Sequence, residues 1–128
     1  MSRNIAIEML NQIPVQDQQI ELVERKCLGH PDSIADGIAE AVSRALCNTY
    51  IDQFGGVLHH NTDQGEIVAG ESMPKFGGGK IIKPIFVLLD GRATKEFNGE
   101  KIAADTVALK AAKDYLRTIL PELNLDQH

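Results

Sequence analysis

The segment from Pro31 to Phe54 constrains the fold of this chain more than any other part of the sequence. Pro31 suits the first position of a helix, where its missing N–H costs nothing, and Gly55-Gly56 follows as a stop signal. Between them, small or apolar side chains recur every three to four residues, as on one face of an α-helix. These residues are Ile34, Ile38, Val42, Ala45 and Thr49. The sequence therefore predicts one long helix with a single apolar stripe.

Shorter apolar runs on both sides of this helix predict strands. Two such runs precede it. Ile20–Lys26 predicts a strand, and Ile5–Leu10 is either a short strand or the start of irregular chain. After the helix we expect two paired strands, Val57–His60 and Glu66–Gly70, because the residues Asn61–Gly65 between them are rich in turn formers.

The second half of the chain predicts another hairpin and a second helix. Ile81–Leu89 is strongly apolar, although Pro84 favours an edge position or a bulge. Arg92–Phe97 is a candidate hairpin partner for it, and Asn98-Gly99 is a strong turn signal. We expect the second helix at Asp105–Leu120. Its N-cap would be Asp105, its end Pro121, and its inner face Ala108, Ala111, Ala112, Tyr115 and Ile119.

This order of strand, helix, strands and helix indicates an α+β fold. We expect a mixed or antiparallel sheet with helices on one face, forming a single domain over residues 1–128. The last residues, Leu123–His128, look like the approach to a further strand. A sheet lacking that strand would expose an edge, so we expect the chain to be part of a longer protein.

Composition excludes several classes of function. The net charge of −5 argues against non-specific nucleic-acid binding, which needs a basic surface. No apolar run approaches the length that spans a membrane, and Met1–Glu8 lacks the features of a signal peptide. Cys27 and Cys47 form no CxxC pair, and we interpret them as free thiols in a reducing cytoplasm.

The tetrapeptide Gly29-His30-Pro31-Asp32 carries the clearest chemical signal. It lies where the long helix begins, and a helix N-terminus attracts phosphate through free N–H groups and a partial positive charge. His30 is placed to donate a hydrogen bond to a phosphate oxygen, and the Asp32 carboxylate is a natural ligand for Mg²⁺ beside a polyphosphate. The alternative is a plain helix start, in which Asp32 serves only as a favourable dipole contact.

Motifs across nearly the whole chain resemble archaeal-type S-adenosylmethionine synthetases, and they keep the order found in that family. Individually the motifs are weak, but together they are specific. They are Glu21-Leu22-Val23-Glu24-Arg25-Lys26, the run from Gly29 to Glu40, Ser43-Arg44-Ala45-Leu46, His59-His60-Asn61-Thr62-Asp63-Gln64, Phe76-Gly77-Gly78-Gly79, Gly91-Arg92-Ala93-Thr94 and Ala108-Leu109-Lys110-Ala111-Ala112-Lys113.

The resemblance implies an enzyme that makes S-adenosylmethionine from ATP and methionine, and then hydrolyses the displaced triphosphate to pyrophosphate and phosphate. It implies three similar α+β domains, of which this chain supplies the N-terminal part, and dimers with active sites at the subunit interface. It also implies Mg²⁺ and, in many members, K⁺. His30 and Gly29 would contact the triphosphate and Asp32 would bind Mg²⁺. The later catalytic lysines of the family are absent, so we expect this chain alone to be inactive.

Other candidates leave alternatives open. Glu71 resembles the carboxylate that contacts the methionine ammonium, but it also fits an exposed strand end. Asp63 is either a site residue or part of a plain turn. Phe76–Lys80 is either a phosphate-binding loop or a flexible hairpin loop, and it lacks the spacing of a P-loop. His59 and His60 alternate on a strand, so at most one faces a given site.

Two rival functions fit parts of the sequence. A zinc-dependent deacetylase would need three protein ligands, which His30, Asp32 and either His59 or His60 could supply. Alternatively, the chain is a non-catalytic assembly domain whose exposed sheet pairs with a partner.

Overall fold

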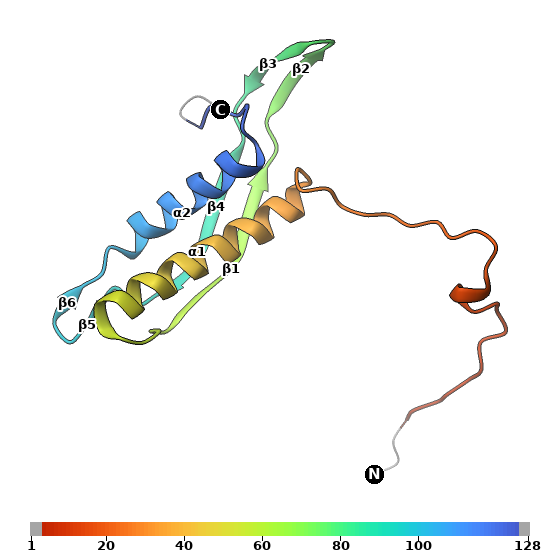
Figure 1. Ribbon diagram of the computed structural model, residues 1–128, viewed down its shortest axis with the longest axis horizontal. Helices are drawn as coiled ribbons and strands as arrows, with labels where there is room; N and C mark the ends of the chain where they lie inside the picture. The colour runs from red at the N-terminus through yellow and green to blue at the C-terminus, as the bar shows by residue number, and fades with distance from the viewer. Residues whose placement is uncertain (1–3, 126–128) are drawn as a thin grey trace.

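A computed structural model describes residues 4–125 of the chain (Figure 1). In order, its elements are the 3₁₀ helix η1 (Val15–Asp17), α1 (Pro31–Phe54), β1 (His60–Val68), β2 (Glu71–Lys75), β3 (Gly78–Lys83), β4 (Phe86–Ala93), β5 (Glu96–Phe97), β6 (Glu100–Lys101) and α2 (Ala104–Ile119).

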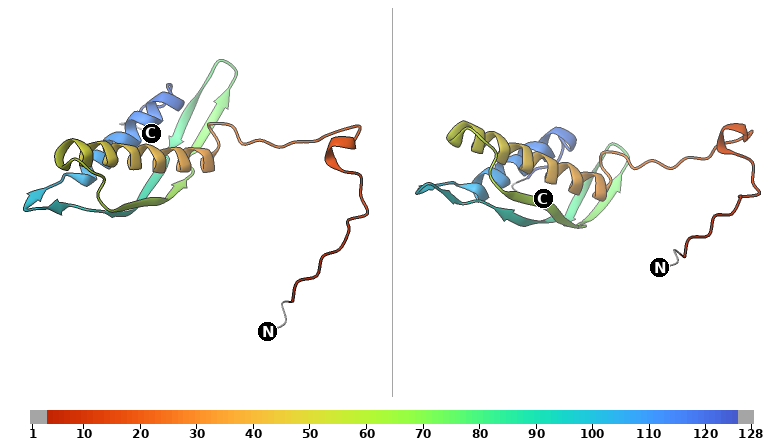
Figure 2. Two further views of the ribbon diagram at one scale, coloured as in Figure 1. Left: turned by 60° about the horizontal axis from the view of Figure 1, so that its bottom comes forward. Right: turned by 90° about the horizontal axis from the view of Figure 1, so that it is seen from below.

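The two long helices lie side by side on one face of a curved antiparallel ladder formed by β1 and β4 (Figures 1 and 2). The β2–β3 hairpin extends from one end of this ladder, and the small β5–β6 hairpin lies at the other end. The expected α+β fold, with an antiparallel sheet and helices on one face, is confirmed. No helix among residues 4–125 is long and apolar enough to cross a membrane.

Helix α1 has the bounds that the sequence predicts, because its end signals are local. His30 is the N-cap, Pro31 is the first helical residue, and Gly55 ends the helix with a φ of +74°. The predicted stripe is wrong in its second half, since Ala45 and Thr49 are only half-buried. The buried positions keep a strict four-residue spacing through Ile34, Ile38, Val42, Leu46 and Tyr50.

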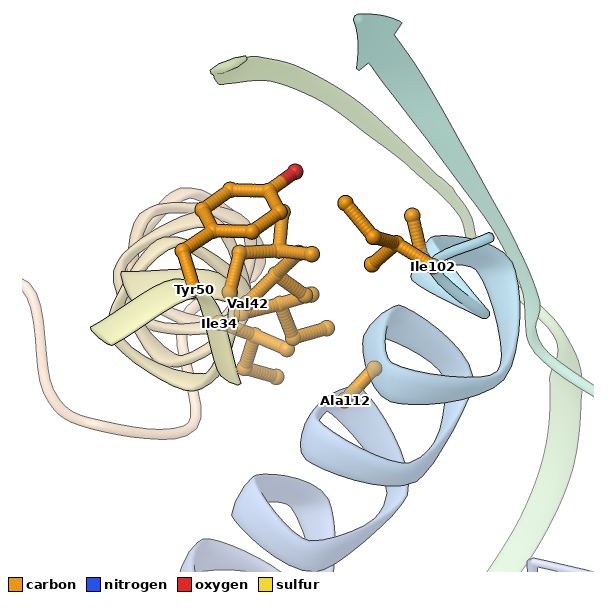
Figure 3. Close-up of a cluster of buried hydrophobic side chains, with 8 residues drawn as sticks. Ile34, Val42, Tyr50, Ile102 and Ala112 are labelled. Atoms are coloured by element: carbon orange, nitrogen blue, oxygen red, sulfur yellow. The ribbon is translucent and has the colours of Figure 1, made fainter. Parts of the chain in front are cut away.

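The core lies between α1, α2 and the inner face of the ladder (Figure 3). Tyr50 is completely buried, and its hydroxyl donates a hydrogen bond to the Thr94 carbonyl at 3.1 Å. Ile102, Ala104 and Ala112 complete the buried cluster from the side of α2. This core fixes α1, and therefore the residues at its N-terminus, against the rest of the fold.

Strand β1 contradicts the predicted turn at Asn61–Gly65, because it runs unbroken from His60 to Val68 and pairs with β4. The polar residues are accommodated by a register shift between Asn61 and Gln64. A Cβ atom at Gly91 would lie 2.3 Å from the Asn61 carbonyl oxygen, so glycine permits this close approach. The predicted pairing of Val57–His60 with Glu66–Gly70 is therefore wrong.

Two other predicted strands differ from the observed ones. The single strand expected at Ile81–Leu89 is interrupted at Pro84, which separates β3 from β4, since proline cannot donate to a strand ladder. The proposed partner Arg92–Phe97 is also wrong: its first residues end β4, and β5 pairs with β6. The turn at Asn98-Gly99 is confirmed, with both residues at positive φ.

Helix α2 begins one residue before the predicted start. Its N-cap is Ala103, and Asp105 lies in the first turn, where its carboxylate accepts a hydrogen bond from Lys95 at 2.8 Å. The residues expected on the inner face of α2 are all buried or half-buried, so that face is confirmed.

The segment before the turn at Cys27–His30 extends away from the body, and its one regular element among the described residues is η1 (Figure 1). The strand predicted at Ile20–Lys26 is absent, because this segment lies beside no other strand within the described residues. Of the two alternatives for Ile5–Leu10, the irregular chain is the one observed. At the other end, residues 123–125 form no strand; the rest of the segment Leu123–His128 lies outside the described residues.

Candidate functional site

The candidate site is built at the first turn of α1, where the chain bends before entering the helix. The His30 N–H donates to the Cys27 carbonyl at 3.1 Å, which closes a tight turn. The Nδ1 atom of His30 then accepts a hydrogen bond from the Asp32 backbone N–H at 3.2 Å, and so caps the helix. Because Nδ1 acts as the acceptor, the proton of a neutral imidazole lies on Nε2.

The Asp32 carboxylate lies at the same end of the helix and forms an ion pair with Lys26. The hydrogen bond and the charge of the Lys26 ammonium hold the pKa of the Asp32 carboxyl below its ordinary value. The Nδ1 atom of His30 is 3.9 Å from Asp32 Oδ1. The first turn of α1 thus holds an ionised carboxylate, an Nε2 donor and an ammonium group within a few ångströms of the helix N-terminus.

All three side chains are open to solvent: the exposed fractions are 54% for Lys26, 40% for His30 and 59% for Asp32. At Gly29, an added Cβ atom would meet only Cys27 Sγ, at 4.0 Å. The protein therefore leaves space beside the turn.

Asp63 and Glu71 lie outside this cluster and line two different pockets. Asp63 borders an open, polar pocket of about 450 Å³, together with Asp36 and Glu40 of α1. Glu71 begins β2 and lines a pocket of about 180 Å³. Figures 1 and 2 place the start of β2 at the same end of the body as the first turn of α1, and the pocket of Asp63 lies against the N-terminal half of α1, from Asp36 to Ser43.

A second polar cluster was not predicted from the sequence. His60 Nε2 lies 3.0 Å from Ser43 Oγ and 3.8 Å from Cys47 Sγ, and its Nδ1 lies 3.0 Å from the Leu58 carbonyl. His60 therefore joins β1 to α1, while the neighbouring His59 contributes its backbone carbonyl to Thr94.

Comparisons with known proteins indicate the family of this chain. The family model for S-adenosylmethionine synthetase (AdoMet synthetase) matches residues 3–128. An S-adenosylmethionine synthase of Methanospirillum hungatei is 99% identical over the whole chain, and this alignment covers 32% of the relative. The synthases of Methanoregula boonei and Methanosarcina mazei are 72% and 61% identical over 99% of the chain.

The chain belongs to the S-adenosylmethionine synthetase family. It spans about a third of the length of the curated relatives that it matches. The resemblance found in the sequence motifs is therefore confirmed at the level of the family. The N-terminus of α1 brings the imidazole of His30 close to the carboxylate of Asp32.

Membership of the S-adenosylmethionine synthetase family contradicts the zinc-hydrolase alternative. Within residues 4–125, no three His, Cys, Asp or Glu side chains come together to hold a metal ion. The His60 ring contacts Ser43 and the Leu58 carbonyl rather than His30 and Asp32.

The glycine-rich segment Phe76–Lys80 is a hairpin tip, as one of its two interpretations predicted. The turn lies at Phe76-Gly77, and the next three residues begin β3 and pair with β2. Cys27 and Cys47 are free thiols, as predicted.

Proposed function

We propose that this chain is the N-terminal part of an S-adenosylmethionine synthetase, and that the first turn of α1 binds the triphosphate of ATP. The observation that carries the proposal is the capped helix start, where His30 presents Nε2–H beside the ionised Asp32 carboxylate. Family membership supports the activity, and the local geometry supports this location for the polyphosphate.

In the proposed reaction, the methionine sulfur attacks C5′ of the ATP ribose. The new C–S bond forms as the C5′–O bond breaks, and the electron pair leaves on the triphosphate oxygen. No protein nucleophile is needed, so catalysis depends on positioning and on stabilising the leaving group. His30 Nε2–H would donate to a triphosphate oxygen, and the positive end of α1 would favour the same charge. The triphosphate is then hydrolysed to pyrophosphate and phosphate.

The donor set fits magnesium better than zinc. Mg²⁺ commonly takes one or two protein carboxylates and completes its shell with water and substrate phosphates, whereas catalytic zinc needs three protein ligands. Asp32 offers one exposed, ionised carboxylate. Bound Mg²⁺ would neutralise part of the triphosphate charge. We propose that K⁺ also assists, without assigning residues of this chain to it.

The remaining site residues are proposed in supporting roles. Glu71, at the start of β2, would bind the methionine ammonium, and Gly29 would leave room for the triphosphate. Asp63 is a weaker candidate, because it lines a separate pocket that does not include His30 or Asp32. Since the chain spans a third of its relatives, we propose that it forms one α+β domain of a three-domain cytoplasmic enzyme and that residues elsewhere complete the site.

A homo-oligomer is proposed on the basis of the outer face of the ladder. Val68, Phe86 and Leu88 are 44% to 61% exposed there, on the side away from the helices. A contiguous apolar face of this kind commonly marks an interface. We propose that a second copy of the protein covers it.

The test uses the full-length M. hungatei synthase carrying residues 1–128 of this chain. We expect His30→Ala to lower kcat on the order of 10²–10³-fold, with little change in the KM for methionine, because the lost donor acts on the leaving group. Asp32→Asn should raise the Mg²⁺ concentration required for half-maximal activity. A matched control is Asp105→Asn, which removes a first-turn, lysine-paired carboxylate from α2 and should change neither property.

The alternative role of this turn, as a helix start only, predicts a different result. Both variants would then lose about 1 kcal/mol of stability through the missing cap and dipole contact, and would turn over normally once folded. Normal kcat and normal Mg²⁺ dependence in folded His30→Ala and Asp32→Asn proteins would refute the assignment.

A further inference from the structure

The ion pair between Lys26 and Asp32 places a cation on the carboxylate that is proposed to bind magnesium. Lys26 stands just before the turn at Cys27–His30, and this turn brings its side chain back to the first turn of α1. Lys26 and Mg²⁺ would therefore compete for the same carboxylate oxygens.

The ion pair between Lys26 and Asp32 is suited to breaking and re-forming with other partners, rather than to a fixed structural role. Both side chains are more than half exposed, and ion pairs in such settings are weak and readily exchanged. The lysine side chain is a flexible stem with three donors, so the ammonium can leave Asp32 and remain near the helix N-terminus. A triphosphate carries more negative charge than one Mg²⁺ neutralises. An ammonium group released from Asp32 could therefore exchange its carboxylate partner for a phosphate oxygen at little cost in electrostatic energy.

A similar pair elsewhere in the fold serves as an internal comparison. Lys95 binds Asp105 in the first turn of α2 at 2.8 Å, with comparable exposure. That helix has Ala103 at its N-cap and no side-chain cap, so no imidazole accompanies the pair. Of these two pairs, the one at the start of α1 is accompanied by the His30 imidazole and by Gly29, which has no side chain.

We propose that Lys26 is a positioning residue of the triphosphate site. It holds the Asp32 carboxylate while no metal is bound, and it moves to a triphosphate oxygen when a divalent cation takes its place. This inference rests on the proposed function, because it takes Asp32 as the magnesium ligand. In this arrangement, metal binding at Asp32 frees the Lys26 side chain to bind the triphosphate, so the two ligands favour each other's binding.

The test measures binding to the full-length M. hungatei synthase carrying residues 1–128 of this chain, by calorimetry with Mg²⁺ alone and with inorganic tripolyphosphate at saturating Mg²⁺. In Lys26→Met, Mg²⁺ alone should bind about two- to five-fold more tightly, because its competitor is gone. Tripolyphosphate should bind roughly tenfold more weakly, because a charge-assisted contact is lost. Lys26→Arg should keep most of the tripolyphosphate affinity, and Lys95→Met should alter neither value.

The opposite changes in the two affinities distinguish this role from a structural one. If Lys26→Met lowers only the melting temperature, or leaves both affinities unchanged, the inference is overturned. His30→Ala and Asp32→Asn measured in parallel separate the two levels of the account. If they weaken binding but Lys26→Met does not, only the role of Lys26 fails; if they too have no effect, the proposed function fails with it.

Discussion

The hydroxyl of Tyr50 offers a sharp test of how the core holds α1. The substitution Tyr50→Phe removes one oxygen from a completely buried side chain and deletes its 3.1 Å hydrogen bond to the Thr94 carbonyl. The Thr94 residue is half-buried, so water can partly replace the lost donor. We therefore expect a loss of about 1 kcal/mol at neutral pH, which corresponds to a fall in Tm of roughly 4 °C for a chain of this length.

The same hydroxyl predicts how this loss changes with pH. Burial raises the pKa of Tyr50 above its ordinary value of 10.0. Above that value the unfolded chain releases the Tyr50 proton while the native protein retains it, so the wild type loses stability as pH rises toward the folded pKa. The Phe variant has no such proton. The difference between the two proteins should therefore shrink above pH 10.

Urea unfolding of both proteins, followed by circular dichroism at neutral pH and at pH values around and above 10, checks both expectations. Tyr115→Phe is the matched control, because it removes the hydroxyl of the only other tyrosine in the chain. We expect it to change stability by less than about 0.5 kcal/mol. Equal stability of Tyr50→Phe and wild type at pH 7, or an unchanged difference at alkaline pH, would refute this account of the core.

Two further substitutions test the elements that carry the site, each by its free energy of unfolding. Leu46→Ala should cost about 2–5 kcal/mol, because Leu46 is only 1% exposed and already borders a cavity of about 290 Å³; a loss below about 1 kcal/mol would show that it is not a core residue. Gly55→Ala should cost about 1 kcal/mol, because Gly55 ends α1 at a φ of +74°, whereas Gly56→Ala should be nearly neutral; equal effects would contradict the left-handed helix end.

The sequence predicts α1 accurately because its limits depend on neighbouring residues. His30, Pro31 and Gly55 act within one turn of the helix ends, and no distant contact is needed to place them. The burial of Leu46 and Tyr50 was missed for a different reason. Residues spaced four apart shift gradually around the helix axis, because one turn takes 3.6 residues. Which of the later positions are buried therefore depends on where α2 and the ladder pack against α1.

The strands were predicted less well because their partners are distant in sequence. Nothing local shows that the polar run at Asn61–Gly65 continues β1, since its pairing depends on β4 some 25 residues later. Conversely, Ile20–Lys26 has the composition of a strand but lies beside no other strand within the described residues. Pro84 did carry a usable signal, because its missing N–H marks the break between β3 and β4.

In the candidate site, too, local contacts could be predicted from the sequence and distant ones could not. His30 and Asp32 come together because they are adjacent at one helix start, which the sequence reveals directly. Lys26 was missed as a partner, because its contact depends on the turn between them. A basic residue just before an acidic first turn was the available signal. The separation of Asp63 and Glu71 into different pockets required the fold.

The central claim, that the first turn of α1 binds polyphosphate, is tested most directly by ¹⁵N NMR of the full-length M. hungatei synthase that carries residues 1–128 of this chain and is labelled at histidine. The sequence has four histidines, and the rings of His30 and His60 serve as probe and internal control. On titration with Mg²⁺ and inorganic tripolyphosphate, the account predicts saturable shifts of the His30 ring nitrogens, led by Nε2, while those of His60 stay fixed in their contacts with α1. Unmoved His30 resonances, or shifts confined to His60, would contradict it.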